Sequence, residues 1–480
     1  MKTVTLQQKQ NRIGCKVYFR RSDRPVNLDG LNEVFSHRRE PVILGGNSQS
    51  RYTKRFSYWS AGPREVFEFR SNQSKPFVKL RHLLDRYRLD ELPQGLPSGV
   101  FCGGWVGYFA YELARYIEKL PQTTRDDFDM PLIRLGLYDK VICLDHSDST
   151  CWLIAVGFED DRVSPEEKLA ELEHFLELSN KEITIPESGE ASANIDYSRL
   201  RCNMDKNYYL ESVEKIRRYI YDGEVYQVNF SQRFEAEYSH SPIELFHWQN
   251  RYNPSGYAAY IGGEDFHIIS TSPEMFITIE NGFIRTRPIK GTRARIEPRR
   301  DKDDYARRIN EKNFAELLES EKEQAELNMI IDLERNDLGR ICRFGTIKVI
   351  QPRTIESYPT VLHAVATVRG ELPEKNNMCD ILRAMFPGGS ITGAPKIRAT
   401  EIIDELEPTQ RGVYTGCIGC LGLNKTACLN IAIRTIIIRN RRAFFQVGGG
   451  IVADSTPQAE WRETLVKAKA MAMALQSLGG

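Results

Sequence analysis

The chain has 480 residues, of which 41% are hydrophobic and 27% charged, a composition typical of a globular enzyme with two domains or one large intertwined unit. Its 66 Lys and Arg residues nearly balance 65 Asp and Glu residues, so the net charge of +1 excludes no fold but gives no reason to expect nucleic acid or an anionic membrane as a partner. No apolar run approaches the roughly 20 residues of a membrane span, and the N-terminus lacks the apolar core of a secretory signal. Together with ten dilute cysteines, expected as reduced thiols, this predicts a cytoplasmic protein.

The first half of the chain mixes short strand-like runs with helical stretches. Residues 166–179 place Leu169, Leu172 and Leu176 on one face of a predicted helix. The Pro-, Gly-, Ser- and Glu-rich stretch that follows has no periodicity, which indicates a linker. We therefore divide the chain into an N-terminal domain over residues 1–182, a linker over 183–197 and a C-terminal domain over 198–480.

The second half has stronger local signals. Apolar periodicity and turn residues predict a helix over Lys206–Asp222, a strand over Val225–Phe234, a hairpin over Phe276–Arg287 that turns at Asn281-Gly282, a long helical block over Asp303–Leu338, a β-branched run over Leu429–Arg439 and a closing helix over residues 457–476. Strands and helices do not alternate as strict βαβ units, so the predicted fold class is α+β.

Two pairs of carboxylates are spaced i, i+3 on predicted helices. They are Glu323 with Glu326, and Glu460 with Glu463. Each pair puts two carboxylates on one helical face, and two such faces together can grip a hard divalent cation through oxygen. Surface salt bridging is the other interpretation, because acidic pairs at this spacing are common on solvated helices.

Glycine-rich segments and one arginine are candidate anion-binding features. Gly388–Lys396 departs from a phosphate loop but offers a turn with clustered N–H groups, and Gly448–Ile451 is predicted as a second such turn. Tight structural turns are the more common explanation of segments of this kind. Arg434, predicted on a strand face with Asn430 and Ala432, suits bidentate carboxylate binding or an internal salt bridge.

Glu274 and Lys290 each stand where a strand is predicted to meet a turn. A lysine beside a glutamic acid can act as nucleophile and general acid, although a lone lysine near a turn is usually a surface residue. The Cys417 and Cys420 pair is predicted to be two buried small residues, since no second cysteine or histidine pair with zinc spacing accompanies it.

The order of these motifs along the chain and the identities of their residues resemble those of a known enzyme family. Across residues 200–475 the chain resembles the chorismate-utilising enzymes, and GGWVGYFAYE (103–112) resembles the motif of their N-terminal domain. The motifs are EVYQVNFSQRF, STSPEMF, RPIKGTRAR, MIIDLERNDLGR, HAVATVRG, FPGGSITGAPK, RGVYTGCIG, NIAIRT and GGGIVADS followed by Glu460 and Glu463. The resemblance implies a sandwich of antiparallel β-sheets with outer helices, like that of anthranilate synthase component I.

Three positions resemble one branch of this family, the aminodeoxychorismate synthases. Anthranilate synthases usually have Ala where this chain has Lys290, and they favour FPAGT-type wording where it has FPGGSITGAPK. Gln227 stands where the water-using isochorismate and salicylate synthases carry a lysine base, and a neutral amide cannot deprotonate water. The implied reaction replaces the 4-hydroxyl of chorismate with an amino group.

The resemblance also implies a role for each matching residue. Lys290 would be the nucleophile, Glu274 the general acid and His363 a residue linked to proton handling near the leaving group. Glu326 and Glu463 would bind Mg²⁺, with Glu323 and Glu460 as water-mediated partners. The expected substrate-binding groups are Arg434, Tyr414, Gly448, Gly449, Gly450, Lys467, Thr392 and Gln227.

The resemblance further implies that ammonia comes from a separate glutamine amidotransferase subunit. GCIGC (416–420) superficially resembles an amidotransferase nucleophile, but no downstream His-Pro-Glu completes a triad. Some family members bind tryptophan in the N-terminal domain. Gly45–Arg55 is the corresponding candidate segment in this chain, and its residues depart from the usual pattern. The rival predictions are anthranilate synthase component I and a catalytically silent chorismate-binding subunit.

Overall fold

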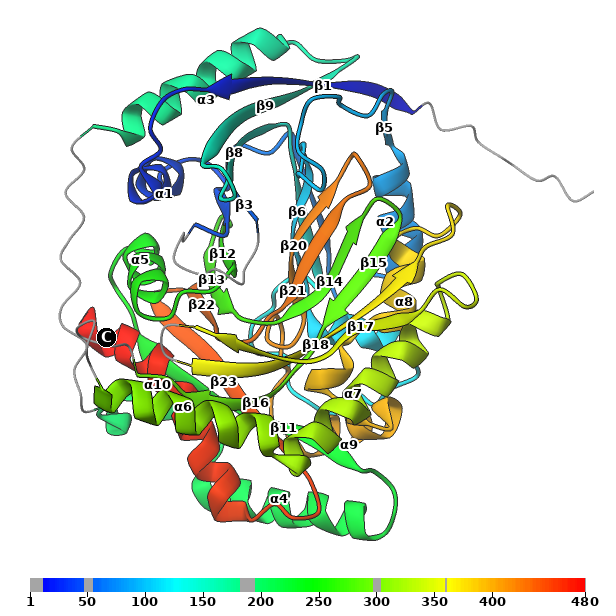
Figure 1. Ribbon diagram of the computed structural model, residues 1–480, viewed down its shortest axis with the longest axis vertical. Helices are drawn as coiled ribbons and strands as arrows, with labels where there is room; N and C mark the ends of the chain where they lie inside the picture. The colour runs from blue at the N-terminus through cyan, green and yellow to red at the C-terminus, as the bar shows by residue number, and fades with distance from the viewer. Residues whose placement is uncertain (1–11, 47–54, 182–194, 297–303, 359–360, 480) are drawn as a thin grey trace, which may run out of the picture.

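The computed structural model describes residues 12–46, 55–181, 195–296, 304–358 and 361–479 (Figure 1). Most of the predicted linker, most of Gly45–Arg55 and the first eleven residues lie outside these ranges. Within them, two large sheets are built almost entirely from antiparallel pairs, and the exception is the short parallel pairing of β1 with β5. Helices surround the sheets, so the predicted α+β class with outer helices is confirmed.

The first sheet has 13 strands within the described residues. In spatial order they are β10 (Arg201–Cys202), β11 (Gln227–Glu237), β23 (Arg442–Ile451), β22 (Thr435–Arg439), β13 (Phe266–Ser272), β12 (Tyr257–Gly262), β2 (Val42–Leu44), β3 (Phe56–Ser60), β8 (Lys140–Asp145), β9 (Thr150–Phe158), β1 (Ile13–Ser22) and β5 (Tyr87–Leu89), with β19 (Gly393–Ala394) paired to β11.

The second sheet has ten strands in the described part of the chain. They are β16 (Ile289–Ala294), β18 (Val361–Glu371), β15 (Phe283–Arg287), β14 (Met275–Glu280), β21 (Ala427–Ile431), β20 (Cys417–Gly422), β6 (Gly104–Phe109), β7 (Ile133–Tyr138) and β4 (Glu65–Phe69), with β17 (Lys348–Ser357) paired to β18.

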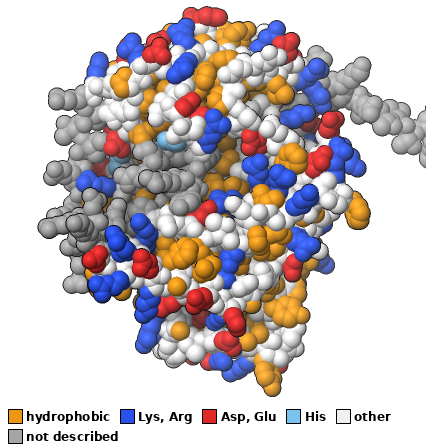
Figure 2. Space-filling view, in the orientation of Figure 1, with side chains coloured by type: hydrophobic (Ala, Val, Ile, Leu, Met, Phe, Trp, Pro, Cys, Tyr) orange, Lys and Arg blue, Asp and Glu red, His pale blue; other side chains and the backbone are white. Residues whose placement is uncertain are grey.

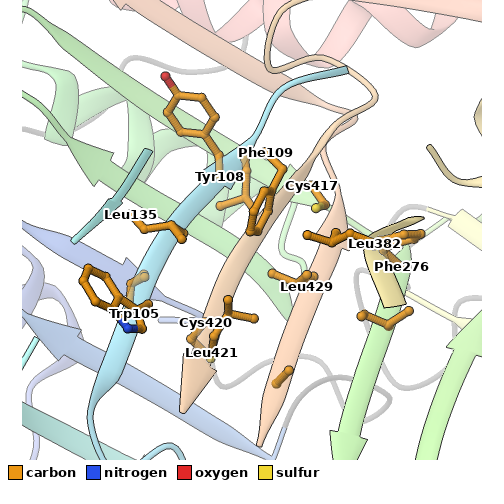
Figure 3. Close-up of a cluster of buried hydrophobic side chains, with 14 of the residues drawn as sticks. Trp105, Tyr108, Phe109, Leu135, Phe276, Leu382, Cys417, Cys420, Leu421 and Leu429 are labelled. Carbon is orange, nitrogen blue, oxygen red and sulfur yellow. The ribbon is translucent and has the colours of Figure 1, made fainter. Parts of the chain in front are cut away.

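Both sheets cross from one half of the chain to the other. In the first sheet β12 pairs with β2, and in the second β20 pairs with β6 along its whole length. Figure 3 shows the side chains around this second junction, where Trp105 and Phe109 of β6 lie beside Cys420 of β20 and Leu429 of β21. The two halves therefore share one hydrogen-bonded framework and one apolar core between the sheets.

Helices cover the outer faces of the sheets. Their bounds are α1 (Leu28–Ser36), α2 (Pro76–Asp85), α3 (Pro165–Ser179), α4 (Lys206–Tyr221), α5 (Pro242–Tyr252), α6 (Asp304–Glu319), α7 (Glu321–Gly339), α8 (Met378–Met385), α9 (Lys396–Leu406) and α10 (Pro457–Ser477), with 3-10 turns η1 (Tyr111–Tyr116), η2 (Tyr197–Arg199) and η3 (Gly389–Ile391). A second core lies under α1, α3, α5 and α10, on the outer face of the 13-stranded sheet.

Most predicted elements are confirmed, and two local predictions are wrong. The helical block over 303–338 is confirmed as two helices, α6 and α7, because Ser320 separates them and caps the second by accepting from Glu323 N–H. The run over 429–439 is two strands in different sheets, β21 and β22. Gly448–Gly450 form no turn, because they lie within β23 and pair with β11. The Asn281-Gly282 hairpin is confirmed, with both residues at positive φ of 50° and 77°.

The mixed charges on the surface and the reduced cysteines match what the composition predicts. Figure 2 shows Lys and Arg interspersed with Asp and Glu on the face in view. None of the ten cysteines, all of them described, is disulfide-bonded, and Cys417 and Cys420 are buried on β20 as predicted. No described helix has the length and hydropathy needed to cross a lipid bilayer.

A half-buried histidine, His247 of α5, joins the second half of the chain to α1 of the first half. His247 Nδ1 lies 3.3 Å from Asp29 Oδ1, and its Nε2 lies 3.2 Å from Glu33 Oε1. Burial alone would lower the pKa of His247, but hydrogen bonding to the two carboxylates outweighs burial and raises the pKa from 6.5 to about 9. The imidazolium therefore stabilises the contact at neutral pH.

Replacing His247 with Gln should destabilise the protein in a pH-dependent way. A raised folded-state pKa gives stabilisation that is complete below 6.5 and is lost as the pH rises through about 9. The shift corresponds to at most about 3 kcal/mol. Thermal unfolding of both proteins should show a large gap at about pH 6 and almost none at about pH 10. An equal gap at both pH values would contradict the ion pairs.

Candidate active site

Lys290 lies on β16 among several of the predicted catalytic residues. Figure 1 shows β16, β18 and β23 in the lower half of the view, between α7 and α10. Burial lowers the pKa of Lys290, and the carboxylates of Glu326, Glu274 and Glu463 act against this shift while Lys467 adds to it. The structure therefore brings these five predicted residues into one charged neighbourhood. Because the pKa of Lys290 is lowered there, its amine becomes neutral at a lower pH than that of a lysine in water.

Glu274 follows the end of β13, as predicted, and its side chain is only 5% exposed. Burial raises its pKa, although a hydrogen bond from Ser390 and the charges of Lys290 and Arg434 oppose the shift. Glu274 Oε1 also accepts a long hydrogen bond of 3.4 Å from Ile289 N–H, the residue before Lys290. A carboxyl that keeps its proton to a higher pH beside an amine with a lowered pKa is suited to acid and nucleophile chemistry.

The first acidic pair lies on α7, against β16. Glu323 Oε1 accepts a hydrogen bond of 2.6 Å from Arg293, and its Oε2 is buried with no partner among the described residues. A Cβ on Gly291, the residue after Lys290, would approach that bare oxygen to 2.9 Å, and the φ of +90° there also favours glycine. Glycine at this position therefore lets the carboxylate lie against the strand that carries Lys290.

The second acidic pair lies on α10, against the glycine strand β23. Glu460 Oε1 accepts from the Ser455 hydroxyl at 2.6 Å, and its Oε2 is again buried without a partner in the described chain. A Cβ on Gly449 would lie 3.0 Å from this bare oxygen. Burial raises the pKa of Glu460. Burial also acts on Glu463, but the adjacent Lys467, whose Nζ is 2.7 Å from Glu463 Oε1, outweighs it and lowers that pKa.

These carboxylates are oxygen ligands of the kind that a hard divalent cation takes. Among the described residues, no three His, Cys, Asp or Glu side chains form a metal-holding cluster, and two of these carboxylates are paired with Arg293 and Lys467. Two buried carboxylate oxygens, one on each helix, nevertheless have no hydrogen-bond partner in the described chain. Such bare oxygens are unfavourable unless a donor or cation reaches them, and they are the donor type that Mg²⁺ prefers.

Arg434 is not on a strand, contrary to the prediction. The chain leaves β21 of one sheet after Ile431 and enters β22 of the other at Thr435, and Arg434 occupies the bend with φ of 49°. Its guanidinium makes no ion pair or hydrogen bond within the described residues, and burial lowers its pKa against the opposing effects of Tyr358 and Glu274. A half-buried guanidinium without an anion favours carboxylate binding over the internal salt bridge.

The other predicted substrate-binding residues occupy different settings. Tyr414 is half-buried, and its hydroxyl makes no hydrogen bond in the part of the chain described. Thr392 is buried, and its hydroxyl donates to Gly388 C=O at 3.0 Å, so it supports the Gly388–Lys396 segment. This segment is the turn η3, the short strand β19 and the start of α9. Lys467 Nζ donates to Gly448 C=O at 2.9 Å and thereby ties α10 to the glycine strand.

Gln227 is fully buried at the start of β11. Neither its amide oxygen nor its amide nitrogen has a partner among the described residues. A Cβ on Gly450 would collide with Gln227 Nε2, so glycine at that position of β23 makes room for the amide. An unsatisfied buried amide is costly and is a candidate contact for a polar ligand.

His363 on β18 is neutral near physiological pH. Its side chain is 2% exposed, Nδ1 lies 2.9 Å from the Thr292 hydroxyl, and Nε2 has no partner in the described chain. Burial, reinforced by the charge of Arg434, lowers its pKa to about 3. Any proton handling by His363 therefore involves the neutral imidazole as acceptor or hydrogen-bond donor.

We expect the imidazole signal of His363 to keep the chemical shift of a neutral ring in NMR spectra between about pH 5 and 8, whereas that of His247, whose pKa is raised, should keep the shift of an imidazolium. The neutral-ring signal should disappear in the His363→Gln variant, which identifies it. Ordinary titration of that signal near pH 6.5 would contradict the buried, neutral state.

Residues that the sequence did not single out complete the site. Glu334 and Asp337 of α7 are buried, and Lys396 Nζ lies 2.6 Å from Asp337 Oδ2. Burial and the charge of Asp337 raise the pKa of Glu334 to about 8, and Glu274 contributes to that shift. These residues stand inside quoted motifs, but charged residues on a helix give no sequence signal that they are buried.

Comparison with known proteins decides the family. Residues 47–473 match the sequence profile of the chorismate binding enzymes. The chain belongs to this family. The predicted use of chorismate is thereby confirmed.

Relatives of two kinds resemble this chorismate binding enzyme to a similar degree. Aminodeoxychorismate synthase component 1 of Bacillus subtilis is 40% identical over 376 residues, covering 78% of this chain and 77% of the relative. Anthranilate synthase component 1 of Pseudomonas aeruginosa is 39% identical over 401 residues, covering 82% and 79%. The crystal structure of anthranilate synthase component I from Streptococcus pneumoniae superimposes with a TM-score of 0.73 at 30% identity, over 88% of this chain and 92% of that one.

Proposed function

We propose that this chain is an aminodeoxychorismate synthase component 1, which converts chorismate and ammonia to 4-amino-4-deoxychorismate, a precursor of 4-aminobenzoate and folate. The observation that carries the proposal is the pair formed by Lys290 and Glu274. Burial lowers the pKa of the amine and raises the pKa of the carboxyl, so each is held toward the protonation state that its proposed role needs.

The proposed reaction uses the pair in two steps. Lys290 Nζ attacks ring carbon 2 of chorismate, both conjugated ring double bonds shift by one position toward carbon 4, and the bond from carbon 4 to its hydroxyl breaks. Glu274 donates its proton to the departing oxygen, which leaves as water because hydroxide is a poor leaving group. Ammonia then attacks carbon 4, both ring double bonds shift back to their original positions, and the bond from carbon 2 to the Lys290 nitrogen breaks, which releases the lysine as a free amine. The enolpyruvyl group is retained throughout.

Two groups of residues are proposed to hold the substrate carboxylates. Glu326 and Glu463, with Glu323 and Glu460 beside them, would hold Mg²⁺, which when bound offsets the charge of one chorismate carboxylate. Arg434 and Tyr414, with the backbone of Gly448–Gly450, would hold the other. The support is the unpaired guanidinium of Arg434 and the two bare carboxylate oxygens within the described residues.

We further propose that a separate glutamine amidotransferase subunit supplies the ammonia. Cys417, the cysteine of this chain whose context resembles an amidotransferase nucleophile, is fully buried in β20, and burial raises the pKa of its thiol. A buried, protonated thiol in a strand interior is a poor nucleophile. The proposed partner is therefore needed when glutamine is the nitrogen source, whereas ammonium should support turnover by this chain alone.

Anthranilate synthase component I is the second candidate, because a relative with that activity is 39% identical. It would eliminate pyruvate and form an ortho-amino product. The purified chain with chorismate, Mg²⁺ and ammonium should develop no anthranilate fluorescence if Lys290 directs amination to carbon 4. Rising anthranilate fluorescence would overturn the proposed function.

A further inference from the structure

A buried arginine outside the proposed catalytic groups joins three segments of the site. The side chain of Arg411 is 2% exposed, and it forms a two-point ion pair with Glu407, with distances of 2.9 Å from Nε to Oε2 and 2.7 Å from Nη2 to Oε1. Glu407 also accepts from Ser231 N–H at 2.9 Å and from the Ser231 hydroxyl at 2.6 Å. The carboxylate thus fixes the guanidinium against β11.

The remaining N–H groups of Arg411 donate hydrogen bonds to three different segments of the chain. Nη2 donates to Asn229 C=O of β11 at 2.7 Å, and Nη1 donates to Ile391 C=O of η3 at 3.2 Å and to the Thr415 hydroxyl at 3.3 Å. A planar guanidinium holds such acceptors at fixed mutual angles, which an ammonium cannot do. Arg411 therefore sets the spacing between β11, η3 and the segment after residue 413.

Each of these segments carries a proposed site residue next to the point that Arg411 holds. Asn229 pairs with Gly450 and is two residues from Gln227, so both side chains lie on one face of β11. Ile391 precedes Thr392, and Thr415 follows Tyr414, whose ring lies 5.8 Å from the guanidinium. A shift of Arg411 would move all three positions together.

The N-terminal half holds the backbone of the same arginine. Glu112 of η1, the last residue of GGWVGYFAYE, is buried and accepts from Arg411 N–H at 2.7 Å and from Gly412 N–H at 3.0 Å. The neighbouring Tyr111 ring lies 4.7 Å from the guanidinium. The motif of the first half thus contacts residues 411 and 412, which immediately precede the segment that carries Tyr414.

We infer that Arg411 is a positioning residue for chorismate binding, and that Glu112 of the N-terminal half fixes it in place. The inference rests on the proposed function only for the assignment of Tyr414 and Gly450 to the substrate carboxylate. A buried ion pair contributes little net stability compared with apolar residues of similar size, so stability alone does not account for this network. Small displacements of binding groups, by contrast, have large effects on rate and affinity.

Steady-state kinetics with chorismate varied at saturating Mg²⁺ and ammonium test the inference. Arg411→Lys keeps the positive charge beside Glu407 but loses the planar fork, so we expect the KM for chorismate to rise about tenfold or more while kcat falls less than about threefold. Glu112→Gln leaves the ion pair of Arg411 with Glu407 intact and removes one of the two side-chain oxygens that accept from the backbone N–H groups of Arg411 and Gly412, so we expect a KM increase of about threefold.

Arg134→Lys is the matched control. Arg134 is equally buried and pairs with Glu40 and Glu68, but it lies on β7 of the N-terminal half. This variant should lose a comparable amount of thermal stability and keep KM within about twofold of the native value. Its kinetics therefore separate a general loss of stability from a loss of positioning.

The inference is overturned if Arg411→Lys and Glu112→Gln keep the native KM, or if Arg134→Lys raises KM as much as they do. If Arg411→Lys does not fold, Glu112→Gln decides the question by the same KM criterion. Product identity is measured separately in the native protein. Formation of anthranilate would refute the proposed function. The comparison of KM values would still test the positioning role of Arg411, because it does not depend on which product forms.

Discussion

Lys290→Ala should lower the ammonia-dependent turnover of chorismate by at least about 10³-fold, because it removes the proposed nucleophile and leaves only binding and electrostatics. The KM for chorismate should change much less, since the carboxylate-binding residues remain. Lys290 is half-buried among Glu274, Glu326 and Glu463, and burial lowers its pKa. Mass spectrometry of the quenched native enzyme should detect a covalent adduct on the peptide containing Lys290.

Lys348→Ala is the control for this prediction. Lys348 lies on β17 of the same sheet but is exposed to solvent, so its loss should leave turnover within about twofold of the native rate. A Lys290→Ala protein that folds normally and retains more than about one tenth of the native rate would exclude Lys290 as the nucleophile.

Glu274→Gln should lower kcat by about 10²- to 10⁴-fold, since Gln cannot donate a proton to the departing hydroxyl. The amide has the shape of the acid and can still accept from Ile289 N–H, so binding should be preserved. Glu280→Gln is the control, because Glu280 ends the next strand, β14, and its carboxylate accepts from the Ser98 hydroxyl and lies near Arg285 at the surface. It should have native kinetics.

The pH dependence of kcat separates the two proposed roles. Glu274 must be protonated, so activity should fall as the pH rises through its raised pKa, whereas Lys290 must be neutral, so activity should rise as the pH climbs through its lowered pKa. The residual activity of Glu274→Gln should lack the alkaline fall. An unchanged alkaline limb in that variant would assign the acid to another residue.

The sequence predicted the fold class and the main elements well because their signals are local. Apolar periodicity located α3, α4 and α10, and the Asn281-Gly282 dipeptide located the β14–β15 turn, since both depend on neighbouring residues alone. The pairing of strands from the two halves was not predictable in this way. Register between β6 and β20 depends on contacts more than 300 residues apart in the chain.

The errors have the same physical origin. A β-branched run over 429–439 has the composition of one strand, and only tertiary structure shows that the chain crosses between sheets at Arg434. Gly448–Gly450 suggested a turn because glycine is frequent in turns, whereas here small residues in a strand make room for Glu460 and Gln227. The buried charges of Arg411, Glu407 and Glu334 gave no signal, because sequence alone does not reveal the burial of a charged residue.

The most direct test of the proposed function is the mass of the product formed from chorismate, Mg²⁺ and ammonium, measured with and without an added aminodeoxychorismate lyase. We expect a product that retains the enolpyruvyl group and that the lyase converts to 4-aminobenzoate and pyruvate. Anthranilate and pyruvate formed without the lyase would contradict the proposed function.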